Sequence, residues 1–185
     1  MRVFIYDKHQ GWLTWMWAIG SWLRALRPGP DKILRVGSWD EMVEKLQALP
    51  DGSVTRVEYW GHGTSGGVKC GKEWAWGPTM KSKDPVRYIV GPLSQVSHVL
   101  APDAVWWWRT CNSFWGVAGK PFAKACADTL GCKVAAFTRI IWWWQGDLRI
   151  AKPSVEPDWD NTGGGYSNPF KHDTVWCMSR GPFDA

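Results

Sequence analysis

The sequence predicts a single α/β domain built in three layers around a mainly parallel sheet. Apolar segments typical of buried strands alternate with amphipathic segments typical of helices over the first 138 residues. The chain has 185 residues, which suits one domain with one sizeable core. Hydrophobic residues make up 45% and charged residues 21%, as in folded globular proteins. Right-handed connections between parallel strands would place helices on both faces of the sheet.

The first two strands are expected on either side of a helix. Residues 2–6 form a short apolar run that predicts a strand. Residues 11–26 have the pattern of a helix, which Pro28-Gly29-Pro30 would end. Ile33 to Val36 predict the second strand. The 11–23 stretch is too short for a membrane span and is followed by charge, so we expect a buried or amphipathic helix there.

The third strand follows a helix with a clear start signal. Ser38-Trp39-Asp40-Glu41 has the pattern of a capping box, in which the serine caps the helix and the glutamate reaches back. This helix should run to about Leu49 and end at Pro50-Asp51-Gly52. Residues 54–60 predict the third strand, and the Gly-rich stretch 61–77 predicts a loop with a small hairpin.

The second half of the chain repeats the alternation and then loses it. Residues 93–100 predict a short helix, 104–109 a fourth strand, 120–130 a helix and 132–138 a fifth strand. We expect a core domain over 1–150, with residues 142–147 entering a hairpin. We expect 151–185, rich in Gly, Pro, Asp and Asn, to form an irregular extension that packs on this domain or trails from it.

Composition excludes several function classes. The net charge of +5 comes from scattered Lys and Arg, and no nucleic-acid-binding pattern appears, so we expect no specific nucleic acid partner. Five cysteines without a CxxC pair predict reduced thiols in the cytoplasm, and the amino terminus lacks the pattern of a signal peptide. No metal-ligand spacing or dinucleotide motif is present, so no cofactor or metal is expected.

The 17 tryptophans are unusual for a chain of this length. Successive side chains of a strand point to opposite faces, so Trp106 to Trp108 should place indoles on both faces of the sheet. We interpret most of the tryptophans as core residues. Any that remain exposed could form a surface for stacking on a sugar, a peptide or a base.

Two short segments carry the strongest chemical signal. His62 follows the third strand in Trp60-Gly61-His62-Gly63, and Cys111 follows the fourth in Arg109-Thr110-Cys111-Asn112. Reactive groups of open parallel sheets collect at the carboxyl ends of the strands. If these strands are neighbours, an imidazole and a thiol would share one cleft, which is the minimal equipment for covalent acyl transfer. The N–H groups of Gly63 and Cys111 could then stabilise an oxyanion.

Two other interpretations of these residues remain open. Cys111 could be a structural thiol and His62 a turn residue that never meets it. Alternatively, Gly63-Thr64-Ser65-Gly66-Gly67 fits G-x-S-x-G, the nucleophile elbow of a serine hydrolase, with Asp147 or Asp158 and His172 as nameable partners. An elbow should lead into a helix, whereas Val68 to Trp76 alternates like a strand.

The arrangement resembles the caspase-like (clan CD) cysteine peptidases, and in particular uncharacterised bacterial caspase-like domains. The resemblance rests on a strand ending in His62-Gly63 and a later strand ending in Cys111, followed by a Gly-containing turn and a helix; it covers roughly residues 54–138. It implies a caspase-like fold and a cysteine endopeptidase acting on a peptide or protein. Thr110 departs from the family, which usually has Ala, Ser or Gly before the cysteine.

The resemblance also implies roles for individual residues. His62 and Cys111 match the catalytic dyad, and Gly63 with Cys111 match the oxyanion hole. We name Asp147, Asn112 and Ser113 as weaker substrate-binding candidates; Asp103, like Asp147, is a candidate for substrate preference because it lies near a predicted strand end. Because several family members have lost activity, the alternative is a non-catalytic caspase-like interaction module with a Trp-rich binding surface.

Overall fold

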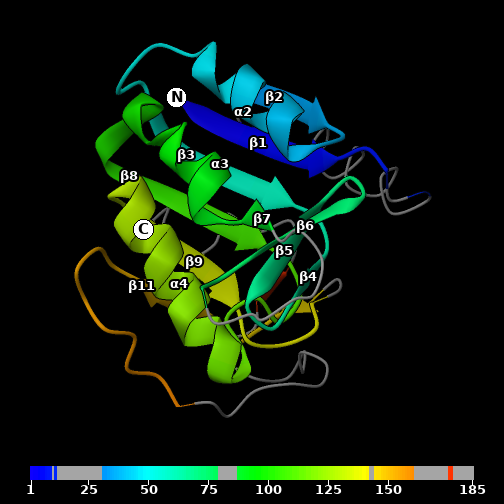
Figure 1. Ribbon diagram of the computed structural model, residues 1–185, viewed down its shortest axis with the longest axis vertical. Coiled ribbons are helices and arrows are strands. Elements are labelled where there is room, and N and C mark those ends of the chain that lie inside the picture. Colours follow the sequence, from blue (N-terminus) through cyan, green and yellow to red (C-terminus); the bar gives the residue numbers. More distant parts are fainter. Residues whose placement is uncertain (10, 12–30, 79–86, 142–143, 161–174, 177–185) are drawn as a thin grey trace.

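A six-stranded sheet forms the centre of the protein (Figure 1). The computed structural model describes residues 1–9, 11, 31–78, 87–141, 144–160 and 175–176. The strand order is β11-β9-β8-β3-β1-β2, and all neighbours are parallel except β11, which is antiparallel to β9. The strands are β1 (Arg2–Asp7), β2 (Lys32–Val36), β3 (Val54–Trp60), β8 (Leu100–Arg109), β9 (Lys133–Phe137) and β11 (Leu148–Ala151). The predicted α/β class with a mainly parallel sheet is therefore confirmed.

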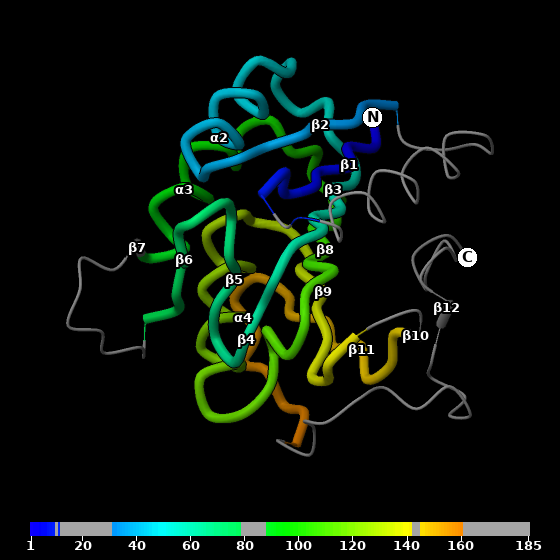
Figure 2. The backbone as a smooth tube through the Cα atoms, turned by 90° about the vertical axis from the view of Figure 1, so that its right-hand side faces the viewer, coloured from blue at the N-terminus to red at the C-terminus, as the bar shows by residue number. Residues whose placement is uncertain are grey.

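The described helices lie on one side of the sheet, as Figures 1 and 2 show together. They are α2 (Trp39–Gln47), α3 (Val90–Ser94), the 3-10 helix η1 (Ser97–Val99) and α4 (Gly116–Leu130). The helix predicted over 11–26 falls almost wholly on residues outside the described ones. Within the described ranges, no helix combines the length and the apolar character that crossing a membrane would require.

Two helix boundaries differ from the sequence prediction. Helix α4 begins at Gly116 and not at Lys120, and α3 ends before β8 begins at Leu100. A Cβ atom on Gly119 would lie 2.2 Å from the backbone of Phe114. This glycine therefore permits close packing inside the helix, whereas the sequence suggested that it ends a turn.

A smaller four-stranded sheet lies beside the carboxyl ends of the central strands (Figure 1). It contains β4 (Gly63–Thr64), β5 (Gly67–Cys70), β6 (Glu73–Trp76) and β7 (Arg87–Tyr88). Strands β4, β5 and β6 pair antiparallel, which confirms the predicted hairpin in the 61–77 stretch. Later in the chain, β10 (Trp144–Gln145) pairs antiparallel with β12 (Val175–Trp176).

The core has one large cluster on the helix side of the sheet and smaller ones on the other side. Trp106 and Trp108 belong to the large cluster, whereas Trp107 packs with Phe137 in a separate one. All three indoles are fully buried, so the predicted alternation of this tryptophan run is confirmed. The large cluster extends to Trp159, whose ring stacks on that of Phe114 at 5.5 Å, so residues near 159 pack on the domain.

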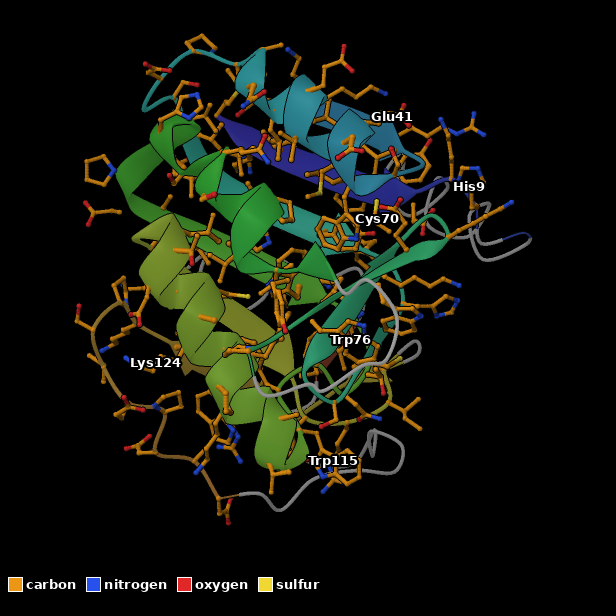
Figure 3. All side chains as sticks on the ribbon, viewed as in Figure 1. His9, Glu41, Cys70, Trp76, Trp115 and Lys124 are labelled. Carbon is orange, nitrogen blue, oxygen red and sulfur yellow. The ribbon has the colours of Figure 1, made fainter. Side chains whose placement is uncertain are left out.

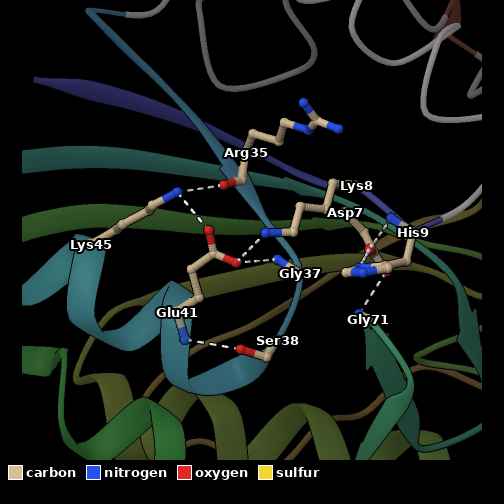
Figure 4. Close-up of polar contacts among 9 residues, drawn as sticks. All are labelled: Asp7, Lys8, His9, Arg35, Gly37, Ser38, Glu41, Lys45 and Gly71. Atoms are coloured by element: carbon tan, nitrogen blue, oxygen red, sulfur yellow. Dashed lines mark hydrogen bonds and ion pairs between the residues drawn. The ribbon is translucent and has the colours of Figure 1, made fainter.

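Helix α2 begins as the capping pattern predicts (Figure 4). The Ser38 hydroxyl accepts a hydrogen bond from the Glu41 N–H at 3.1 Å. The Glu41 carboxylate accepts from the Gly37 N–H at 2.8 Å, one residue earlier than in a standard box. Lys8 and Lys45 also donate to it, at 2.9 and 2.8 Å. These bonds, the one from Lys45 first, lower the pKa of Glu41 from 4.5 to about 2.

We predict that Glu41→Gln lowers the free energy of unfolding by about 1 kcal/mol at neutral pH, the usual size for a cap combined with partly exposed ion pairs. Because the pKa of Glu41 is lower in the folded chain, its contribution is full above pH 4.5 and is lost as the pH falls toward 2. Urea unfolding of both proteins across this range measures the difference. An equal difference at pH 2 and pH 7 would contradict the assignment.

Candidate active site

The two strands that carry the candidate residues are neighbours. Strands β3 and β8 pair in parallel, and Trp60 is the register partner of Arg109. The Arg109 guanidinium lies over the Trp60 ring, 4.8 Å from its centroid, so these two side chains share one face of the sheet. His62 and Cys111 each come two residues after this pair. The sequence prediction that they follow adjoining strands at the same edge is therefore correct.

The loops beyond these strands are in direct contact. A Cβ atom on Gly63 would lie 2.7 Å from the Cys111 carbonyl oxygen and 2.4 Å from the Ser113 hydroxyl. A side chain at position 63 would therefore force the loops apart. The Lys69 N–H donates to the His62 carbonyl at 2.9 Å, which fixes the His62 backbone against β5. The segment after His62 thus runs along the turn that holds Cys111.

The Cys111 thiol is partly exposed. Its side chain packs against the cluster that contains Trp107, Phe137 and Ile141, and its Sγ atom lies 3.7 Å from the Ile141 carbonyl oxygen. Burial raises the pKa of this thiol above its usual value of 9. At neutral pH the sulfur is therefore protonated, and it needs a base before it can act as a strong nucleophile.

The protonation state of the His62 imidazole suits it to act as that base. Burial lowers its pKa below 6.5, and the Lys69 ammonium group lowers it further, while Asp7 acts in the opposite direction. The ring is consequently neutral at pH 7, with a nitrogen able to accept a proton. The resting forms of the two groups are therefore a thiol and a neutral imidazole.

Asp7, which the sequence analysis did not name, also lies at this edge. It is the last residue of β1, and its side chain is fully buried. Its carboxylate accepts hydrogen bonds from the Gly71 N–H at 2.8 Å and the His9 N–H at 2.9 Å (Figure 4). An acidic residue ending an apolar strand was a visible signal, but the sequence could not show that β1 neighbours β3.

The proposed substrate-binding residues occupy different positions. Asn112 lies in the turn, has a left-handed φ of 54° and donates its N–H to the Arg139 carbonyl. Ser113 is fully buried, and its hydroxyl shares a 2.6 Å hydrogen bond with that of Thr110. Since it is closed off from solvent, Ser113 stabilises the turn and does not reach a substrate.

The two acidic candidates lie apart from each other. Asp147 forms an ion pair with Arg139, and its carbonyl accepts from the Thr138 N–H, so it holds the connection after β9. Asp103 is an exposed residue within β8, near the amino end of the strand. Asp103 was predicted to set substrate preference because it lies near a strand end. That end is the amino end of β8, which runs from Leu100 to Arg109, so Asp103 lies far from the carboxyl edge.

The G-x-S-x-G segment forms the β4–β5 hairpin turn. Its Ser65 hydroxyl donates to the Trp115 carbonyl at 2.5 Å, and β5 follows where an elbow would have a helix. Asp158 lies in the irregular segment after β11, and His172 is outside the described residues. The strand–turn–helix context of a serine hydrolase is therefore lacking around Ser65.

A network of buried charged side chains lies near the ends of β3 and β8. It is on the face of the sheet that Trp60 and Trp107 share. Glu58 pairs with Arg56 at 3.0 Å and with Arg109 at 2.9 Å. Arg109 donates to the Gln145 side-chain oxygen at 2.8 Å, and its guanidinium lies 3.6 Å from the Trp107 ring centroid. This network fixes Arg109 two residues before Cys111. Among the described residues, no three potential metal ligands cluster together.

We predict that Gly63→Ala lowers the free energy of unfolding by about 1–3 kcal/mol, because the new methyl group would meet the Cys111 carbonyl. Gly91→Ala is the matched control, since a Cβ atom there has no neighbour within 4 Å. Thermal unfolding of both variants measures the effect. Equal stability of Gly63→Ala and the parent chain would mean that the two loops do not pack as described.

Comparison of the chain with protein-family models, with curated proteins and with solved structures found no match.

Proposed function

We propose that the protein is a cysteine endopeptidase with His62 and Cys111 as its catalytic pair. The observation that supports this most strongly is the in-register pairing of β3 and β8, from which both residues project two positions beyond Trp60 and Arg109. A thiol and an imidazole at one sheet edge, both partly exposed and both shifted toward neutrality, suit general-base activation of the sulfur.

The proposed reaction proceeds in two balanced steps. As the Cys111 sulfur bonds to the scissile carbonyl carbon, its proton moves to the His62 ring and the carbonyl π electrons move onto oxygen. The oxyanion then collapses, the C–N bond breaks, and the leaving amine takes the proton from His62. A water oxygen then bonds to the thioester carbon as His62 takes one of the water protons. The C–S bond breaks, the acid leaves, and the sulfur takes the proton back from His62.

The N–H groups of Gly63 and Cys111 are our candidates for the oxyanion donors. The two residues lie on touching loops, and the missing side chain of Gly63 lets the Cys111 loop approach it this closely. A caspase-like fold is the finer architecture that we propose, and the parallel order of β1, β3, β8 and β9 is compatible with it.

A non-catalytic interaction module is the second candidate. It is favoured by Trp74 and Trp76, which stack at 5.1 Å and are only half-buried. Trp115 and Val117, after the Cys111 turn, are exposed. Figure 3 shows Trp76 on the small sheet and Trp115 before α4. An aromatic surface of this kind can hold a peptide or a glycan without chemistry.

We predict that His62→Gln slows alkylation of Cys111 by iodoacetamide about tenfold or more at pH 7, because the thiol would lose its base. Of the described cysteines, Cys111 alone is partly exposed, so fast labelling by itself would report exposure and not activation. Mass spectrometry of the labelled peptide gives the rate at this residue. The matched control is His98→Gln, which removes an exposed histidine on η1. Identical rates in all three proteins would favour the interaction module.

We predict that Cys111→Ala abolishes cleavage of a peptide library while changing the free energy of unfolding by less than about 1 kcal/mol, because the thiol is only partly buried. Library digestion followed by mass spectrometry, with urea unfolding alongside, checks both parts. Cleavage that persists in this variant would exclude Cys111 as the nucleophile.

A further inference from the structure

Asp7 lies at the point where the strand order of the sheet reverses. The chain goes from β1 to β2 on one side, and then from β3 to β8 on the other. Ligand crevices of open parallel sheets form at such a switch, outside the carboxyl ends of the two central strands. The register pairs Tyr6 with Trp60, so Asp7 stands level with Gly61, directly before His62.

The Asp7 carboxylate is fixed relative to His62 by one hairpin. The Gly71 N–H, just after β5, donates to Asp7, and the Lys69 N–H in the same strand donates to the His62 carbonyl. Gly71 has a φ of +64°, and a Cβ atom on it would lie 1.9 Å from the Gly37 carbonyl oxygen. The hairpin end is therefore wedged against the β2–α2 connection and cannot easily shift.

Several ionisable groups face this carboxylate. Tyr59 and Cys70 lie beside it, and burial raises both pKa values, that of Cys70 to about 12. These two groups are therefore neutral at pH 7. The His9 Nδ1 atom lies 3.9 Å from an Asp7 oxygen on the more exposed side. For His62, the charged groups that act on it are Lys69, which disfavours a positive ring, and Asp7, which favours it.

We propose that Asp7 is a positioning residue that stabilises the imidazolium formed on His62 when the Cys111 thiol gives up its proton. This inference rests on the proposed peptidase function. The negative charge of Asp7 offsets the opposing effects of Lys69 and of burial. It acts at the step where the ring becomes cationic and the sulfur electron pair bonds to the carbonyl carbon, so its effect is larger in the transition state than in the resting enzyme.

We predict that Asp7→Asn slows iodoacetamide alkylation of Cys111 about fivefold or more at pH 7 and moves the His62 titration midpoint to lower pH. Carbon-13 NMR of labelled histidine rings follows the midpoint, and His62→Gln assigns the signal. Asp103→Asn, an exposed residue at the other end of the sheet, is the matched control. A purely structural Asp7 would lower stability but leave the midpoint and the rate of the folded chain unchanged, which would overturn the proposal.

A second measurement does not depend on the Asp7 variant folding. In a His9→Gln background, the other imidazole that faces Asp7 is removed. The carbon-13 chemical shift of the Asp7 carboxyl group, followed against pH, should then show a step at the pH where His62 titrates. The step should vanish when His62→Gln is added. Absence of the step would overturn the inference. Because these NMR signals need no turnover, a chain that shows the step yet cleaves no peptide would contradict the peptidase proposal while leaving the Asp7–His62 coupling established.

Discussion

The parallel pairing of β3 with β8 is the constraint on which the rest of the site depends. Its register sets Trp60 beside Arg109, and neighbouring strands lie about 4.8 Å apart. Two residues later the chain has no freedom to separate His62 from Cys111 widely, because Gly63 touches the Cys111 carbonyl. Gly61 also packs directly on the Tyr59 ring. The segment that follows β3 therefore stays close to the end of that strand. The backbone hydrogen bonds between β3 and β8 thus set where both loops begin. Glycine, which has no side chain, then lets the two loops come into contact.

The strands that lead to the candidate site carry buried charged side chains that form ion pairs with one another. Arg56, Glu58 and Arg109 are all nearly inaccessible to solvent, and the carboxylate serves both guanidinium groups. Removing Glu58 would take this carboxylate away from two buried guanidinium groups, which is far more destabilising than losing a surface ion pair. The rings of Trp60 and Trp107 cover Arg109 through cation–π contacts. This arrangement explains two of the many tryptophans: they accompany a buried guanidinium, and they help make β8 rigid up to the residue before Thr110.

Local patterns in the sequence predicted local structure well. The bounds of β3, the capping of α2 by Ser38 and the hairpin after Gly61 all follow from short-range rules of alternation, capping and turn chemistry. Long-range relations were beyond these rules. That Asp7 stands beside the strand of His62, and that Ser113 is enclosed by Thr110 and Gly63, depend on strand order and loop packing. The start of α4 was missed for a similar reason, since the glycines at 116 and 119 suggested a turn, while Gly119 serves tight packing on Phe114.

The protonation states at the sheet edge indicate where a reaction would meet its barrier. Burial holds both the Cys111 thiol and the His62 ring in their neutral forms, so no preformed ion pair is stored in the resting site. Creating that pair separates charge in a partly desolvated place, which is costly unless fixed charges oppose the cost. Lys69 disfavours the imidazolium, and the Asp7 carboxylate, held by two backbone N–H groups, favours it. Burial, the largest effect on the His62 pKa, and Lys69 therefore both act against a protonated His62 ring, and Asp7 is the group that acts for it.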